Sequence, residues 1–148
     1  MKIEVLQIER AREEEVRILC HEVGPDIVEI IDFVKSKDMT LQAYADMAIH
    51  QILLRDIYYV EAVNNRVFAY LEKAVYELKM KLYEFEGMYE SRRFFRCSKS
   101  VIVNLMKIES IRPALNSRFA AKMANGEAVI ISRQYVAALN HKLGGGRT

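Results

Sequence analysis

The chain has 148 residues, 51% of them hydrophobic, and a formal net charge of +2. This length fits one domain with an extension, and the apolar content is high enough for a packed core, which excludes disorder of the whole chain. No apolar run approaches the roughly 18 to 20 residues of a membrane span. The amino terminus does not resemble a signal peptide, and the two cysteines, Cys20 and Cys97, exclude a disulfide framework and a structural zinc site. We therefore expect a cytoplasmic protein with no membrane insertion, metal or cofactor.

The charge is divided unevenly along the chain. Residues 1–87 carry 11 Lys and Arg against 17 Asp and Glu, whereas residues 88–148 carry 11 against three, a balance of 11 − 3 = +8. A basic half on a nearly neutral chain is typical of proteins that bind a polyanion, and nucleic acid is the leading candidate.

The first 45 residues predict a strand–strand–helix extension. Residues 2–9 and 15–21 alternate as strands do, and a polar turn separates them. Gly24-Pro25-Asp26 then opens a helix, because proline suits its first turn and an acid suits its positive end. Apolar residues recur at helical spacing after that point, namely Ile27, Ile30, Ile31 and Val34. Residues 39–45 are expected to be extended.

From residue 46 the pattern changes to short strands and turns. Strands over 56–63 and 67–71 flank Asn64-Asn65-Arg66, where adjacent asparagines favour a hairpin turn. A helix is predicted over about 73–84. Further strands are predicted around Phe94–Arg96, Val101–Val103, 108–115, 118–123 and 127–131, with a turn at Asn125-Gly126. Ser132 is a good N-cap for a last helix, which Gly144 would end before a flexible tail, residues 144–148. The fold class is α+β, mainly antiparallel β.

The run from Phe94 to Leu105 carries the most functional information. An aromatic pair leads into Arg96-Cys97-Ser98-Lys99-Ser100, and a β-branched strand follows. A short polar and cationic loop between two strands directs donors outward, and phosphate oxygens and base edges accept such charge-assisted hydrogen bonds. An ordinary hairpin with a solvated basic tip is the alternative. Asn104 at the end of the strand is expected to cap the turn toward Met106.

Several motifs in fixed order resemble the LytTR DNA-binding domain of bacterial transcription regulators. They are Ile57-Tyr58-Tyr59-Val60-Glu61-Ala62, Asn64-Asn65-Arg66, Phe94-x-Arg96-x-Ser98-x-Ser100-x-Ile102-Val103-Asn104, Asn125-Gly126-Glu127 and Ile131-Ser132-Arg133-Gln134-Tyr135. The resemblance covers about residues 46–143. It implies an elongated antiparallel β fold whose loops enter successive major grooves of double-stranded DNA and read its sequence.

The resemblance also implies the site residues. Three loops would contact DNA, and arginines near the second would hold its backbone. Arg96 has two open roles, a phosphate contact or an intramolecular ion pair, and Arg92 and Arg93 are expected to clamp the DNA backbone. The candidate DNA-binding residues are Asn64, Asn65, Arg66, Arg92, Arg93, Arg96, Ser98, Lys99, Ser100, Ser132 and Arg133. Many family members have histidine at the position of Ser98 and asparagine or arginine at that of Lys99, so the target sequence does not transfer.

The extension is too short for the receiver domain that usually precedes a LytTR domain, so the chain resembles a stand-alone member. Residues 1–45 are then a candidate dimerisation or regulatory element, and a homodimer on tandem or repeated sites is expected. Some stand-alone relatives are held inactive by a small membrane protein, which makes such a partner another candidate.

Two other functions stay open at this point. One is a protein-interaction module of the same fold whose basic face is incidental. The other is an RNA or single-strand binder, which the pairs Tyr58-Tyr59 and Phe94-Phe95 would favour if their rings were exposed. No catalytic constellation is present, so no enzyme activity is expected. Cys97, between Arg96 and Lys99, is either an oxidisable thiol or a small residue that fills a hairpin.

Overall fold

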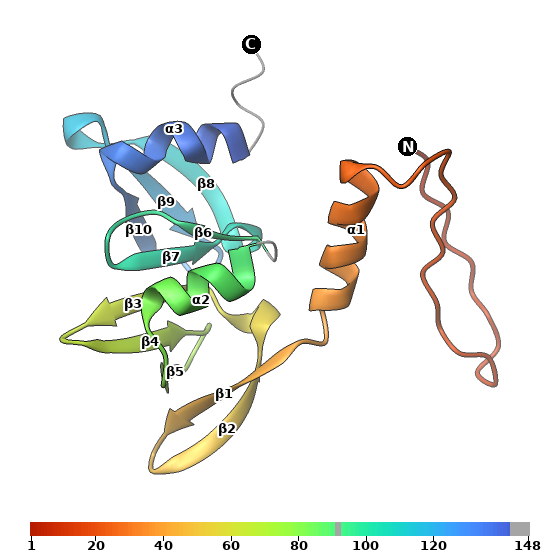
Figure 1. Ribbon diagram of the computed structural model, residues 1–148, viewed down its shortest axis with the longest axis horizontal. Coiled ribbons are helices and arrows are strands. Elements are labelled where there is room, and N and C mark those ends of the chain that lie inside the picture. Colours follow the sequence, from red (N-terminus) through yellow and green to blue (C-terminus); the bar gives the residue numbers. More distant parts are fainter. Residues whose placement is uncertain (91–92, 143–148) are drawn as a thin grey trace.

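The computed structural model describes residues 1–90 and 93–142, and these contain two antiparallel sheets and three α-helices (Figure 1). The helices and strands in chain order are α1 (Pro25–Ser36), β1 (Thr40–Ala45), β2 (Ala48–Leu53), β3 (Tyr59–Val63), β4 (Arg66–Tyr70), β5 (Val75–Leu78), α2 (Leu82–Tyr89), β6 (Phe94–Arg96), β7 (Val101–Asn104), β8 (Ile108–Pro113), β9 (Phe119–Met123), β10 (Ala128–Ile131) and α3 (Arg133–Lys142). Among these residues no helix is long and apolar enough to cross a membrane.

The larger sheet has seven strands in the order β2-β1-β5-β4-β3-β7-β6. Its β3–β4 hairpin pairs Val63 with Arg66, and β3 also pairs with β7. Helix α2 covers one face near β6, where the buried ring of Phe85 lies edge-on to that of Phe94 with centroids 5.1 Å apart. This face holds one hydrophobic core, because alternate residues of β3, β4 and β7 point into it.

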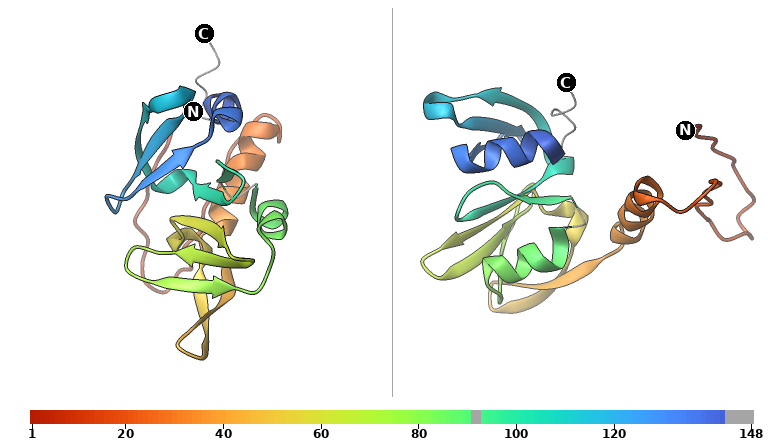
Figure 2. Two further views of the ribbon diagram at one scale, coloured as in Figure 1. Left: turned by 90° about the vertical axis from the view of Figure 1, so that its left-hand side faces the viewer. Right: turned by 45° about the horizontal axis from the view of Figure 1, so that its top comes forward.

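The smaller sheet has three strands in the order β10-β9-β8, and together with α3 it lies beside the β6–β7 hairpin (Figures 1 and 2). A second core forms between them, and its fully buried members include Cys97, Val103, Met123 and Leu139. The β6–β7 hairpin contributes side chains to both cores. Its position therefore depends on packing against each sheet.

The extension is only partly as predicted. Helix α1 is present; Ile27 is buried and Ile30, Ile31 and Val34 are half-buried, whereas Val28 and Phe33 are exposed. The prediction of two strands over 2–9 and 15–21 is wrong, because neither segment forms a ladder with another strand. This segment runs out and back beyond α1 (Figure 1) and leaves Ile3 and Leu19 86% and 90% exposed. Alternation favours a strand only where a partner strand supplies hydrogen bonds.

Two other expectations are corrected by the sheet. The predicted helix over 73–84 is wrong, because Val75–Leu78 is strand β5, which pairs with β4, and the helix begins only at Leu82. The Lys81 backbone N–H donates to Glu84 Oε1 at 2.9 Å and so stabilises that helix start. The expected boundary after residue 45 falls inside the β1–β2 hairpin, so β1 belongs to the sheet. The predicted tail, residues 144–148, lies outside the described residues.

Candidate nucleic-acid interface

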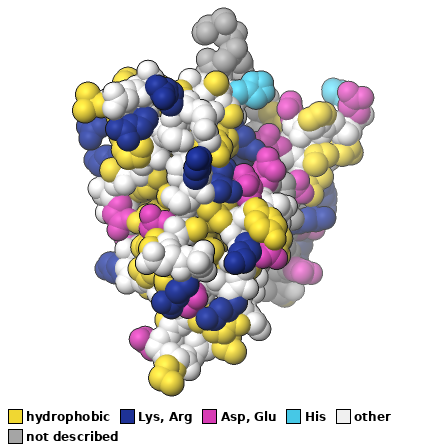
Figure 3. All heavy atoms as spheres, turned by 60° about the vertical axis from the view of Figure 1, so that its left-hand side comes forward, with side chains coloured by type: hydrophobic (Ala, Val, Ile, Leu, Met, Phe, Trp, Pro, Cys, Tyr) yellow, Lys and Arg dark blue, Asp and Glu magenta, His cyan; other side chains and the backbone are white. Residues whose placement is uncertain are grey.

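Four connections meet at one end of the molecule, at the left of Figure 1. They are the β3–β4 turn, the β6–β7 loop, the β8–β9 connection and the short link from β10 to α3. Figure 3 brings this end toward the viewer and shows Lys and Arg side chains gathered on its upper part. The three loops that the sequence predicted as one DNA-binding surface are therefore on the same end of the fold.

The β3–β4 turn is fixed by its two asparagines. Asn64 and Asn65 have φ values of 50° and 64°, and positive φ at both central residues is the geometry of a type I′ hairpin turn. Both residues are exposed. Arg66 is less free, because its guanidinium binds Glu77 on β5 with contacts of 2.8 and 3.2 Å and lies over the ring of Phe68. Its hydrogen bond lowers the pKa of the Glu77 carboxyl, which keeps that carboxylate ionised.

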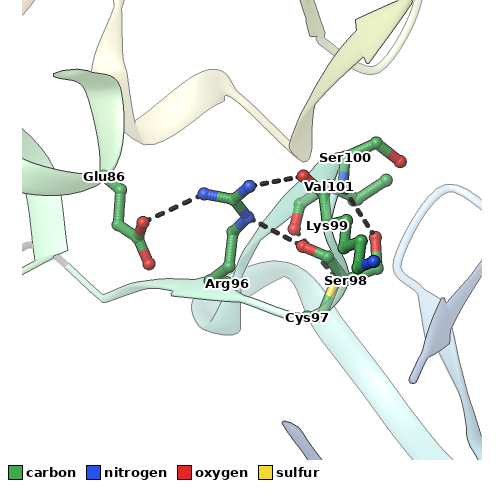
Figure 4. Close-up of polar contacts among 7 residues, drawn as sticks. All are labelled: Glu86, Arg96, Cys97, Ser98, Lys99, Ser100 and Val101. Atoms are coloured by element: carbon green, nitrogen blue, oxygen red, sulfur yellow. Dashed lines mark hydrogen bonds and ion pairs between the residues drawn. The ribbon is translucent and has the colours of Figure 1, made fainter. Parts of the chain in front are cut away.

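The β6–β7 loop is closed by its own backbone. The N–H groups of Cys97 and Ser98 donate to the carbonyl of Val101 at 3.0 and 3.3 Å, and the Ser100 N–H donates to Ser98 Oγ at 3.3 Å. Lys99 is the exposed residue of this loop and forms no ion pair within residues 1–90 and 93–142. Figure 4 shows the loop and its contacts. The loop thus presents one free cation between two serines.

Arg96 points back into the protein, as Figure 4 shows. Its Nε donates to the Ser98 carbonyl at 2.7 Å, a terminal nitrogen donates to the Lys99 carbonyl, and the other terminal nitrogen lies 3.0 Å from Glu86 Oε1 on α2. Its side chain is only 20% exposed. Of the two roles left open by the sequence, the intramolecular ion pair is the one formed.

Ser132 joins the β6–β7 loop to the start of α3. Its backbone N–H and its Oγ both donate to the carbonyl of Cys97, at 2.8 and 3.3 Å. Helix α3 begins at the next residue, Arg133, as the N-cap prediction required. Arg133 is exposed and, like Lys99, has no ion pair within the described residues. The contacts of Ser132 with the Cys97 carbonyl therefore hold the backbone of the loop that carries Lys99 beside the start of α3, which carries Arg133.

The structure does not bring Arg93 to these loops. Arg93 lies at the other end of β6, with φ of 72°, and its guanidinium binds Glu29 of α1 at 2.7 Å. It connects the extension to the β domain. Arg92, the other expected backbone clamp, lies outside the described residues.

Two buried residues near the site have structural roles. Asn104 is 3% exposed, donates to the Ile57 carbonyl at 2.8 Å and accepts from the Met106 N–H at 2.9 Å, which confirms the predicted cap. Cys97 is fully buried, and this burial raises the pKa of its thiol to about 12. Its thiol is therefore protonated and inaccessible, which contradicts the interpretation of an oxidisable cysteine.

The aromatic pairs do not form an open stacking platform. Tyr58 and Phe94 are buried, while Tyr59 and Phe95 are half-buried against the second core. Tyr59 also stacks on Tyr70 with ring centroids 4.4 Å apart. The condition that favoured a single-strand binder is therefore not met by these rings.

Sequence reasoning missed the β8–β9 connection. An open hollow of about 580 Å³ lies at this end of the fold, and its lining includes residues from three connections. The lining residues are Lys99, Asn116, Arg118, Ser132, Arg133 and Gln134. Asn116 and Ser117 have φ values of 61° and 60°, and an arginine follows them, much as Arg66 follows Asn64-Asn65. An Asn-containing turn followed by arginine was the signal that could have identified this segment.

Comparisons with known proteins identify the family of this chain. The LytTr DNA-binding domain family matches residues 47–144. A transcriptional regulator of Staphylococcus aureus, described as HTH-type and uncharacterised, is 28% identical over 145 residues, 97% of this chain and 98% of that protein. Transcriptional regulatory protein YpdB of Escherichia coli is 32% identical over 90 residues, 61% of this chain but only 37% of YpdB.

A solved structure supports the fold assignment. It is the LytTr DNA-binding domain of a Bacillus cereus protein described as a methyl-accepting/DNA response regulator, with a TM-score of 0.67 and 28% sequence identity. The match covers 71% of this chain and 96% of that domain. The expected fold class, mainly antiparallel β with short helices, is confirmed. Since the family match spans well over half of the sequence, this chain belongs to the LytTR family of DNA-binding domains, which is not an enzyme family.

Proposed function

We propose that this protein is a transcription regulator that binds duplex DNA sequence-specifically, with loops that enter the major groove. Its membership of a DNA-binding family supplies the coarser part of this statement. The observation that carries the finer part is the pair of unpaired cations, Lys99 and Arg133, on connections that Ser132 ties together. Ser132 fixes the backbone from which both side chains start, and this suits base contacts because direct readout requires donors that approach from defined positions.

Each loop has a separate role in this proposal. Arg133 reads a guanine edge, which offers two acceptors to a guanidinium, and Lys99 reaches guanine or a phosphate. Asn64 and Asn65 in the β3–β4 turn offer amide groups that suit adenine, while the hydroxyls of Ser98, Ser100 and Ser132 contact phosphates or hold the loops. Arg66 contributes positive charge to the same end but remains on Glu77.

Self-association through the extension is the second part of the proposal. The segment 1–23 exposes large apolar side chains, including Ile3, Val5 and Leu19. A second copy that covered them would place two loop sets on tandem sites and strengthen binding through effective concentration. Leu19→Glu should then yield monomers by light scattering and lose the preference for tandem over single sites. If the unchanged protein is a monomer at micromolar concentration, a small membrane protein becomes the better candidate for this segment.

Selection from random duplex DNA at two salt concentrations tests the main proposal. An enriched motif whose binding weakens with salt is expected, because phosphate contacts release counterions. Arg133→Ala should cost about 1–3 kcal/mol on the selected duplex and flatten base preference at one position. Lys142→Ala is the matched control, since Lys142 is an exposed cation at the other end of α3.

The competing functions predict different outcomes. Salt-sensitive retention without a motif would indicate a general nucleic-acid binder, and stronger retention of a single-stranded competitor would indicate an RNA or single-strand binder. No retention at either salt concentration would overturn the proposal in favour of an interaction module.

A further inference from the structure

The hollow beside the β6–β7 loop is lined by the β8–β9 connection as well as by two of the predicted loops. Its walls are the β6–β7 loop with Lys99, the start of α3 with Arg133, and the β8–β9 connection with Asn116 and Arg118. Of the six lining residues within the described part of the chain, three are cations and none is an acid. The lining would therefore attract an anion, and the amides of Asn116 and Gln134 can donate further hydrogen bonds to it, whereas the Ser132 hydroxyl already donates to the Cys97 carbonyl.

The cations of the hollow differ from other basic residues of this half. Arg93 and Arg96 form ion pairs with Glu29 and Glu86. In the part of the chain that the structure describes, Lys99, Arg118 and Arg133 have no such partner. Three uncompensated cations around one open hollow repel one another, and a bound anion would relieve that repulsion.

Arg118 is held in a way that suits a phosphate. Its Nε donates to the Leu115 carbonyl at 3.1 Å, across the turn of Asn116 and Ser117. This contact occupies the inner nitrogen and leaves the two terminal nitrogens of the guanidinium for a partner. A guanidinium with a fixed fork binds two oxygens of one phosphate with little loss of side-chain freedom.

We propose that the hollow is a phosphate site, in which Arg118, assisted by Asn116, binds one backbone phosphate of the same duplex that Lys99 and Arg133 read. The β8–β9 connection is then a fourth DNA contact, one that sets the position of the duplex and carries no base preference. This inference rests on the proposed function, since it requires that a duplex lies against this end of the protein.

Binding of the selected duplex across a range of salt concentrations tests the inference. One lost phosphate contact lowers the slope of log affinity against log salt by about 0.9, which corresponds to about eightfold weaker binding near 0.1 M salt. Arg118→Ala should show this change with an unaltered selected motif, and Arg118→Lys should recover part of the affinity. Arg112→Ala is the matched control, because Arg112 is an exposed cation on β8 that does not line the hollow.

A duplex series with single methylphosphonates locates the contact. At one position the neutral linkage should weaken binding of the unchanged protein but not that of Arg118→Ala. An unchanged slope for Arg118→Ala, in protein that unfolds at the normal temperature, would overturn the inference while the proposed function stands. Loss of base preference in this variant would also overturn it, because Arg118 would then read a base. No binding of duplex by the unchanged protein would overturn both proposals.

Discussion

Replacement of Arg96 separates the two roles that the sequence left open for it. In the structure Arg96 holds the β6–β7 loop through the carbonyls of Ser98 and Lys99 and is itself held by Glu86. Arg96→Met keeps the apolar stem and removes all these contacts. Hydrogen bonds of a charged group contribute about 1.5–3 kcal/mol each when they are buried. Carbonyls that become exposed recover much of this from water, so the free energy that favours the ordered loop conformation should fall by about 2 kcal/mol in total.

This loss predicts the size of the binding defect. Apparent affinity falls in proportion to the fraction of protein in the competent loop conformation, so 2 kcal/mol corresponds to at most about 30-fold weaker binding. Fluorescence anisotropy with the selected duplex, repeated at several salt concentrations, measures both affinity and slope. Because the Arg96 guanidinium is occupied by contacts within the protein and should not reach DNA, the slope should stay unchanged although affinity falls.

Two further variants sharpen the test of Arg96. Arg96→Lys retains the charge but not the planar fork, so it should bind nearly as weakly as Arg96→Met. Glu86→Gln removes a negative charge beside Arg96, and it should not improve binding if the arginine only positions the loop. A slope lowered by about 0.9 in Arg96→Met, or tighter binding by Glu86→Gln, would refute this reasoning and show a direct phosphate contact.

Three other predictions concern buried and turn residues. Asn104→Ala leaves the Ile57 carbonyl without the donor that Asn104 supplies. The free energy of unfolding should fall by about 2–3 kcal/mol, which lowers the melting temperature by roughly 5 to 10 °C; a shift under about 2 °C would contradict this prediction. Asn65→Gly suits the positive φ of 64°, so stability should be unchanged or slightly higher while duplex affinity falls; equal affinity would exclude a base contact. Burial raises the pKa of the Cys97 thiol to about 12, whereas the thiol of the unfolded chain loses its proton near pH 8.5. The free energy of unfolding, measured in urea, should therefore decline as the pH rises from about 9 toward 12. In Cys97→Ala the decline below about pH 10 should be smaller.

Local chemistry was sufficient to predict much of the β domain. The Asn64-Asn65 and Asn125-Gly126 turns followed from residues that tolerate positive φ, and both have it, at Asn64, Asn65 and Gly126. The helical spacing of Ile27 and its neighbours predicted α1 correctly. These features depend on a few adjacent residues, which is why the sequence alone was informative.

Features that depend on distant partners could not be predicted in this way. Val75, Leu78, Leu82 and Phe85 fit a helical stripe, but pairing with β4 makes the first two residues part of a strand. The N-terminal segments have strand alternation without a partner strand in the described chain. Hydrogen bonding across a sheet, rather than intrinsic preference, decides both cases.

The candidate site shows the same difference between features set by adjacent residues and features set by distant partners. The order of the loops and the exposure of Lys99 and Arg133 agree with what the sequence suggested. The acids that hold Arg66, Arg93 and Arg96 lie 11, 64 and 10 residues away in sequence, so nothing local indicated that these arginines were already paired. The hollow was missed because its third wall is the β8–β9 connection, and the distance in sequence between Arg118 and either Lys99 or Arg133 gave no sign that the three lie together.

The carbonyl of Cys97 accepts two hydrogen bonds from Ser132, and this contact bears on the spacing of the bases in the operators, the DNA sites that the protein would recognise. It links the loop that carries Lys99 to the helix that carries Arg133, so the distance between the backbone positions of these two residues is set by the fold. If Lys99 and Arg133 read bases as proposed, substitutions at either tip should change which base is preferred but not the number of base-pair steps between the two bases. Related regulators with the same contact between these two segments should therefore differ in the bases of their operators and agree in the spacing of those bases. Inserting one base pair, about 3.4 Å, between the two contacts should weaken binding more than changing either base.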